Sequence, residues 1–85
     1  MTVRFFAAAR AASGAGERLL TVSDPATIAS ALDAARTAVP DADRAGFDAV
    51  MARCSFLVNE IATGDRANPL RDGDLIDVLP PFAGG

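Results

Sequence analysis

The sequence predicts an α+β domain in which a mixed sheet of four to five strands packs over one main helix, with a short second helix. Apolar residues alternate at period two near both ends of the chain, which is typical of strands. Between these segments, apolar residues recur at helical spacing. The 85 residues, 51% hydrophobic and 22% charged, suit one folded domain.

Two strands and a hairpin loop are predicted at the beginning of the chain. Residues 2–9 (TVRFFAAA) alternate between two faces and predict the first strand. Residues 12–16 (ASGAG) are small and contain two glycines, as a hairpin loop does. Residues 18–23 (RLLTVS) then predict the returning strand.

The main helix is predicted from residue 28 to residue 39. Thr27 is a suitable N-cap, although Asp24-Pro25 is a competing helix start, and Pro40 ends the helix. A shorter helix is predicted after Asp41. The apolar positions that define the two helices are Ile28, Ala31, Leu32, Ala35 and Val39 in the first, and Phe47, Val50 and Met51 in the second.

Strand character returns at residues 54–59, in a short segment at 61–63, and at 75–79 (LIDVL). In the last strand, Ile76 and Val78 are expected to face the core, while Leu75, Asp77 and Leu79 face outward. The order of elements predicts that the first and last strands pair in parallel at the centre of the sheet. This is the β-grasp architecture of ubiquitin-like proteins.

Composition excludes several classes of function. The net charge of −3 argues against nucleic-acid binding, which needs clustered cations. The chain has no histidine, so the usual general base and the commonest metal ligand are missing, and one cysteine makes no internal disulfide. No apolar run is long enough to span a bilayer. We therefore expect a cytoplasmic protein without a metal site, an autonomous active site or a membrane partner.

The chain ends in Pro80-Pro81-Phe82-Ala83-Gly84-Gly85, directly after an apolar strand. Two prolines do not continue a sheet, so we expect a β-grasp domain over residues 1–79 and a flexible tail over residues 80–85. Six extended residues reach about 20 Å, and a Gly-Gly end passes through a channel that excludes any Cβ. The simpler alternative is a frayed terminus with no role.

Several short segments along the chain match one known family. The sequence resembles the small, sulfur-carrying subunit of molybdopterin synthase, within the ubiquitin-like carriers that also serve thiamine synthesis. It departs from that pattern at Ser30, where a glutamate is expected. The matching segments are Phe5-Phe6-Ala7, Arg10, Ser13-Gly14, Val58-Asn59, Pro69-Leu70, Asp72-Gly73-Asp74 and Pro80-Pro81-Phe82-Ala83-Gly84-Gly85.

The resemblance implies a mechanism in which Gly85 is the reactive residue. A partner adenylating enzyme would use ATP to activate its carboxylate, and a persulfide sulfur donor would convert it to a thiocarboxylate. Inside the large synthase subunit, the tail would give this sulfur to cyclic pyranopterin monophosphate for molybdenum cofactor synthesis. No cofactor would be bound by the chain itself.

Three alternatives stay open. The same chemistry could serve thiamine thiazole, cysteine or tRNA thiolation. The chain could instead be a non-covalent ubiquitin-like binding domain with an idle terminus, or a protein-tagging modifier that links Gly85 to lysines of other proteins.

Outside the tail, a few residues have competing interpretations. Phe6 and Leu79, with Leu57 as a weaker candidate, are predicted to form a partner-docking patch or else to be ordinary sheet residues. For Cys54, a small core residue is favoured over a persulfide relay. Turn formation explains Asp72 and Asp74 better than a cation site does, and these residues with Asp77 could also steer basic partners.

Overall fold

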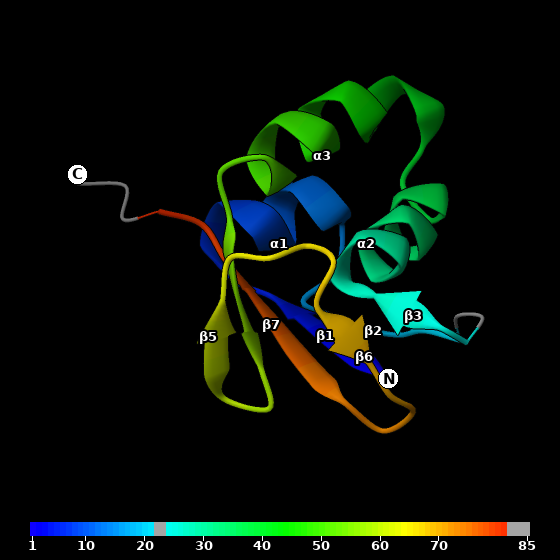
Figure 1. Ribbon diagram of the computed structural model, residues 1–85. Coiled ribbons are helices and arrows are strands. Elements are labelled where there is room, and N and C mark those ends of the chain that lie inside the picture. The colour runs from blue at the N-terminus through cyan, green and yellow to red at the C-terminus, as the bar shows by residue number, and fades with distance from the viewer. Residues whose placement is uncertain (22–23, 82–85) are drawn as a thin grey trace.

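The computed structural model describes residues 1–21 and 24–81, and it places three helices on one face of a sheet (Figure 1). A five-stranded sheet has the order β2-β1-β7-β4-β5, and a separate two-stranded sheet pairs β3 with β6. The strands are β1 (Thr2–Phe5), β2 (Glu17–Leu19), β3 (Ala26–Thr27), β4 (Ser55–Val58), β5 (Ile61–Thr63), β6 (Pro69–Leu70) and β7 (Leu75–Leu79). The helices are α1 (Ala7–Ser13), α2 (Ile28–Thr37), the 3-10 turn η1 (Asp41–Asp43) and α3 (Arg44–Met51).

The first and last strands pair in parallel at the centre of the main sheet, as the sequence predicted. Thr2 lies opposite Leu75, and Phe5 lies opposite Val78. On their outer sides, β2 pairs antiparallel with β1 and β4 pairs antiparallel with β7. The mixed sheet, its strand number and the helices over it confirm the β-grasp prediction.

The first ten residues correct the sequence analysis. The predicted strand over residues 2–9 ends at Phe5, and α1 replaces the rest of the strand and the beginning of the predicted loop. Alternation across an alanine run does not distinguish strand from helix, because alanine is compatible with either face and has the highest helix propensity. The chain turns abruptly at Ala7, whose φ of 48° is unusual for a residue with a side chain. Gly14, with φ 76°, ends the helix.

Local hydrogen bonds fix the beginning of α2 at the predicted N-cap. The Thr27 hydroxyl accepts from the Ser30 backbone N–H at 3.2 Å, and the Ser30 hydroxyl accepts from the Thr27 N–H at 2.8 Å. Together these bonds form a capping box. Ser30, where the resembled family was expected to have a glutamate, therefore has a structural role of its own.

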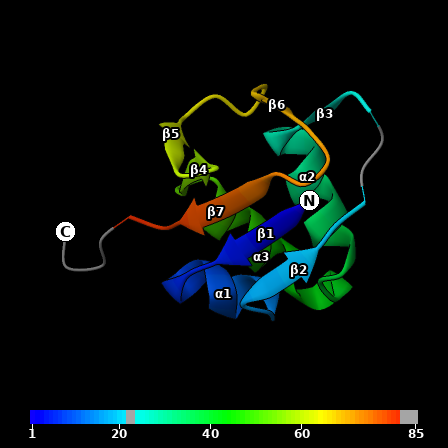
Figure 2. The same ribbon diagram turned by 90° about the horizontal axis from the view of Figure 1, so that it is seen from below.

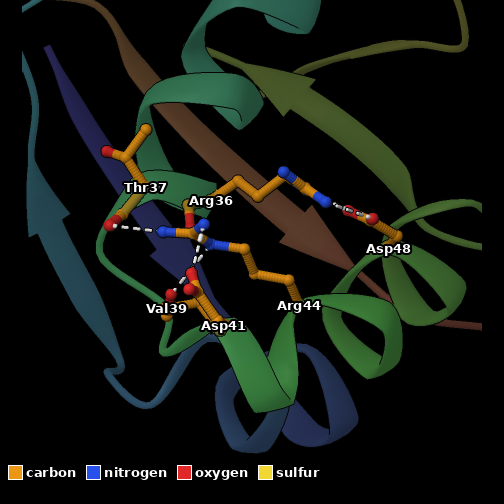
Figure 3. A network of polar contacts seen from close by, with 6 residues as sticks. All are labelled: Arg36, Thr37, Val39, Asp41, Arg44 and Asp48. Carbon is orange, nitrogen blue, oxygen red and sulfur yellow. Dashed lines mark hydrogen bonds and ion pairs between the residues drawn. The ribbon is translucent and has the colours of Figure 1, made fainter.

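Arg44 ties the end of α2 to the beginning of α3 (Figure 3). Its guanidinium donates to the backbone oxygens of Arg36, Val39 and Thr37, at 3.2, 3.0 and 3.3 Å, at the end of α2 and just beyond it. Arg36 also forms a two-bond ion pair with Asp48 of α3, at 2.8 and 3.0 Å. This network holds the two helices in a fixed relation over the sheet.

Two further features of the fold were not predicted. Asn59 and Glu60, both with positive φ, form the two-residue turn between β4 and β5. The small β3–β6 sheet joins the beginning of α2 to the segment before β7, with Ala26 opposite Leu70. A two-residue strand has too little alternation for a sequence pattern to reveal it.

A single core forms between the sheet and the helices. Phe5 and Phe47 meet edge to face, with ring centroids 6.4 Å apart. The predicted inward residues Ile76 and Val78 are buried in this core. Its other members are Met1, Val3, Ala9, Ala26, Ile28, Ala31, Leu32, Ala35, Val39, Met51, Phe56 and Leu70. Within residues 1–21 and 24–81, no helix has the length and apolar character needed to cross a bilayer.

Candidate functional site

The end of β7 places the base of the predicted tail at one end of the sheet. Leu79 is the last strand residue, and its carbonyl accepts a hydrogen bond from the Ser55 hydroxyl at 3.3 Å. Pro80 follows partly buried, and Pro81 is exposed. The predictions for Phe82, Ala83, Gly84 and Gly85 fall outside the described residues and stay predictions.

One face of the main sheet carries no helix, and Figure 2 shows β1, β2 and β7 in front of the helices when the molecule is viewed from this side. We call it the open face. Strand register assigns to it the side chains that alternate with the core residues. These are Thr2 and Arg4 of β1, Glu17 and Leu19 of β2, Ser55 and Leu57 of β4, and Leu75, Asp77 and Leu79 of β7.

The three predicted docking residues lie together on the open face. Phe6 is extended, and its N–H donates to the Val78 carbonyl at 3.2 Å, so it continues the β1–β7 register and comes opposite Leu79. Phe6 is 40% exposed. Leu79 and Leu57 are half-buried, and Leu57 lies opposite Asp77 in the β4–β7 register. The structure thus brings the three residues to the end of the sheet from which the tail departs; their docking role stays a prediction.

An ion pair that the sequence analysis missed lies at the centre of this patch. Arg4 donates two hydrogen bonds to the Asp77 carboxylate, at 2.6 and 2.9 Å. The same guanidinium carbon is 5.7 Å from the centroid of the Phe6 ring. The pair could have been predicted from the sequence, because Arg4 and Asp77 have matching outward positions in two strands predicted to be neighbours.

The Arg4–Asp77 pair also corrects the expectation for Asp77. The residue is on the outward face as predicted, yet only 6% of it is exposed, because Arg4 covers it. Hydrogen bonding to Asp77, reinforced by its charge, raises the pKa of Arg4 further above its ordinary value. The guanidinium is therefore a permanent cation fixed in position beside the exposed Phe6 ring.

The base of the tail also borders an open hollow of about 260 Å³. Its walls come from α1, from the end of α3 and from the two prolines that follow β7. Arg53 is the charged residue at its rim and is exposed. The lining residues are Ala8, Ala49, Val50, Arg53, Pro80 and Pro81. Helix α1 was not predicted, and for that reason this hollow was not predicted either.

Cys54 packs against the core, in agreement with the interpretation that the sequence favoured. Its thiol donates to the Val50 carbonyl at 3.3 Å. Burial raises the pKa of the Cys54 thiol, with Arg66 opposing the shift. A thiol in this environment is less ionised than a free one, which does not suit a persulfide relay.

The three aspartates considered for a cation site lie in separate environments. Asp77 is paired with Arg4, while Asp72 is fully exposed 4.0 Å from the N-terminal ammonium group. Asp74 accepts from the Arg71 backbone N–H at 2.8 Å and from the Asn59 amide at 2.9 Å. These hydrogen bonds lower the pKa of Asp74. Asp74 therefore has the turn-forming role that the sequence suggested.

Sequence comparison supplies the family. The model of the ThiS family matches residues 3–85, nearly the whole chain and including the terminal glycines. The chain belongs to the ThiS family. No curated protein matches the chain at a significant level.

Solved structures share the fold of this ThiS-family chain. SAMP1 from Haloferax volcanii is 26% identical, with a TM-score of 0.81 over 100% of this chain and 98% of that one. A chain in the complex of subunits 1 and 2 of molybdopterin-converting factor from Helicobacter pylori is 25% identical, with a TM-score of 0.60 over 99% and 96%. A protein described as molybdopterin converting factor subunit 1 from Pyrococcus furiosus, 20% identical, has a TM-score of 0.75 over 94% of each chain and supports the fold alone.

Proposed function

We propose that this ThiS-family protein is the sulfur carrier of molybdopterin synthase and that Gly85 is its reactive residue. The observation that carries the proposal is the Pro-Pro-Phe-Ala-Gly-Gly sequence that follows β7 of a β-grasp domain. The family match extends to residue 85, which supports a role for the terminus.

The chemistry suits a chain without a catalytic base. A free carboxylate is a poor electrophile, and adenylation by a partner enzyme with ATP gives the Gly85 carbonyl a good leaving group, AMP. A persulfide sulfur then replaces AMP, which yields a thiocarboxylate. The chain has no histidine, so acid–base and phosphate-binding groups would come from the partners, in the cytoplasm, where ATP is present.

The domain would position the sulfur rather than activate it. Two prolines at the end of β7 direct the chain away from the sheet, and six residues span about 20 Å. A thiocarboxylate held on this tail inside a partner would react with cyclic pyranopterin monophosphate at a high effective concentration. This arrangement needs a docking surface near the base of the tail.

The open face supplies a candidate for that surface, with Phe6, Leu57 and Leu79 around the Arg4–Asp77 pair. The similar chain from Helicobacter pylori comes from a complex of subunits 1 and 2 of molybdopterin-converting factor, which supports a larger subunit as the partner. Aromatic residues such as Trp and Tyr, and arginine, are enriched among the residues that contribute most to binding at protein interfaces.

The proposal is tested by intact mass. After incubation with a cognate adenylating enzyme, ATP and a persulfide donor, the protein should gain the mass difference of one sulfur for one oxygen. Adding the large synthase subunit and cyclic pyranopterin monophosphate should then return the protein to its original mass as molybdopterin forms. No mass gain, with an enzyme that thiolates another carrier in parallel, would refute the proposal.

The docking patch gives a separate prediction. Replacing Phe6 with alanine should weaken binding to the large subunit by about tenfold or more, because a half-exposed aromatic anchor is lost. The melting temperature should change little, since Phe6 is outside the core. Isothermal titration calorimetry and thermal unfolding would measure the two effects.

Leu19→Ala is the matched control for Phe6→Ala. Leu19 is 83% exposed on the open face, but it lies opposite Thr2 at the end of the sheet far from the tail. This variant should bind normally. Equal loss in both variants, or normal binding by Phe6→Ala, would place the interface elsewhere.

A protein-modifier role is the second candidate. It is favoured by the likeness to SAMP1, the small archaeal modifier protein 1 of Haloferax volcanii. In that case Gly85 would be found in isopeptide bonds to lysines of other proteins, by mass spectrometry of tryptic digests.

The family match equally accommodates a carrier for thiamine synthesis, and reconstitution with the large synthase subunit separates the two carrier roles.

A further inference from the structure

The basic side chains of this protein are chemically unusual as a set, because all eight are arginines and lysine is absent. A guanidinium stays protonated below about pH 12 and has no lone pair with which to attack an acyl group. A lysine amine, with an ordinary pKa near 10.4, is partly neutral and therefore reactive at moderately alkaline pH. None of the 85 side chains therefore has a primary amine, and the structure adds the α-amino group of Met1.

That amine is held inside the structure. The Met1 ammonium donates to the Leu20 carbonyl at 3.0 Å and lies 4.0 Å from an Asp72 carboxylate oxygen. Met1 itself is 8% exposed and belongs to the core. An exposed α-amino group is usually the most reactive amine of a chain near neutral pH, because its pKa is about 8. Here burial and hydrogen bonding shield the nitrogen from an approaching acyl group.

The Met1 amine and the base of the tail lie at opposite ends of the main sheet. Because β1 and β7 are parallel, Met1 lies beside the beginning of β7, whereas the tail departs from its end (Figure 2). Five strand residues separate these ends by about 16 Å. The tail would have to reverse at Pro80-Pro81 and run back along the sheet to reach Met1.

The remaining nucleophile of high intrinsic reactivity is the Cys54 thiol. It is half-buried, donates to the Val50 carbonyl, and has a raised pKa because of burial. Since the thiolate is the attacking species, acyl transfer to Cys54 is slowed as well.

We infer that this protein is a one-way acyl donor: its activated Gly85 reacts with nucleophiles of other proteins, and neither its own chain nor a second copy serves as the acceptor. In the excluded reaction, an amine nitrogen would attack the Gly85 carbonyl carbon, a C–N bond would form, the C–O bond to AMP would break, and the amine proton would pass to water. The inference rests on the proposed function only for this activated carboxyl group. One consequence is that the activated carrier is not consumed by acylating itself. A second is that, if it modifies other proteins, it does not form chains of several copies on one target.

The shielded amine can be tested without any partner enzyme. The N-hydroxysuccinimide ester of acetic acid should acetylate Met1 of the native protein at least about tenfold more slowly than in urea, since reaction requires local opening. Intact mass against time measures both rates. Equal rates in the native and unfolded protein would overturn the inference.

The acceptor test uses two matched variants, Arg53→Lys and Arg71→Lys. Both arginines are exposed, but Arg53 borders the hollow at the base of the tail, while Arg71 precedes the beginning of β7. With the adenylating enzyme and ATP but no sulfur donor, the unchanged protein should release AMP slowly and keep its mass. Arg53→Lys should lose one water as the tail closes on the new amine, and Arg71→Lys should not cyclise at low protein concentration.

The outcomes separate the inference from the proposed function. A dimer or loss of water in the unchanged protein would overturn the inference. AMP release from Arg53→Lys without cyclisation would overturn its explanation, namely that the missing lysines prevent self-acylation. If no variant releases AMP, the proposed adenylation is wrong, and the acetylation rates still decide whether the amine of Met1 is shielded.

Discussion

Removing Gly85, or adding one alanine after it, is expected to abolish sulfur transfer while leaving the free energy of unfolding unchanged. In the proposed mechanism the carboxylate itself carries the sulfur, so a terminus displaced by one residue, about 3.5 Å, no longer meets the activating centre. An added Cβ would also obstruct a channel built for glycine. Pro80 and Pro81, the part of this tail that the structure describes, are not members of the core, so stability should not fall.

This prediction is measured by thiocarboxylate formation in the intact-mass assay and by chemical denaturation of each variant. Both variants should retain binding through the open face, which calorimetry with the large subunit would detect. Full sulfur transfer by the Gly85 deletion would show that the terminus is idle and would favour a non-covalent binding domain.

Phe47→Ala is expected to produce the largest loss of stability. Phe47 is 2% exposed, fixes α3 over the sheet, and meets the Phe5 ring edge to face. Truncating a buried phenylalanine to alanine typically costs about 3–5 kcal/mol, because apolar burial is lost and a cavity is left behind. A domain of this size has roughly 5–15 kcal/mol of stability in total. The melting temperature should fall by about 12 °C or more.

Thermal and urea unfolding of Phe47→Ala can be compared with Phe6→Ala, which removes the same ring from the open face. The first variant should lose stability and the second should lose partner binding. Similar stability losses in the two variants would mean that the Phe6 ring stabilises the fold as much as the buried Phe47 ring does. That result would contradict the division between core and open face.

Much of this division between core and open face could be predicted from the sequence. Alternation placed Ile76 and Val78 inward, and the crossover rule paired the first and last strands in parallel. The N-cap at Thr27 was also correct, because capping depends on a few adjacent residues. The predictions failed at α1, where alanines satisfy both periodicities, and at β3 and β6, which are too short to show any period.

Part of the candidate site was likewise recoverable. Phe6, Leu57 and Leu79 were selected from outward positions in neighbouring strands, and the structure brings them together on one face. The burial of Asp77 was missed, because its cover comes from Arg4, 73 residues earlier in the chain. The shielding of the Met1 amine by Leu20 was missed for the same reason.

The sequence by itself determined the β-grasp fold, the absence of histidine and lysine, and the Gly84-Gly85 segment on which the proposed chemistry rests. These properties depend on composition and on local periodicity, which a linear chain already contains. Only the tertiary structure decided that α1 lies beside the base of the tail, that Arg4 neutralises a buried Asp77 at the centre of the open face, and that Met1 is enclosed at the opposite end. Each of these depends on how segments far apart in the sequence pair and pack. Strand register is set by which residues the whole chain buries, and a local pattern does not show it.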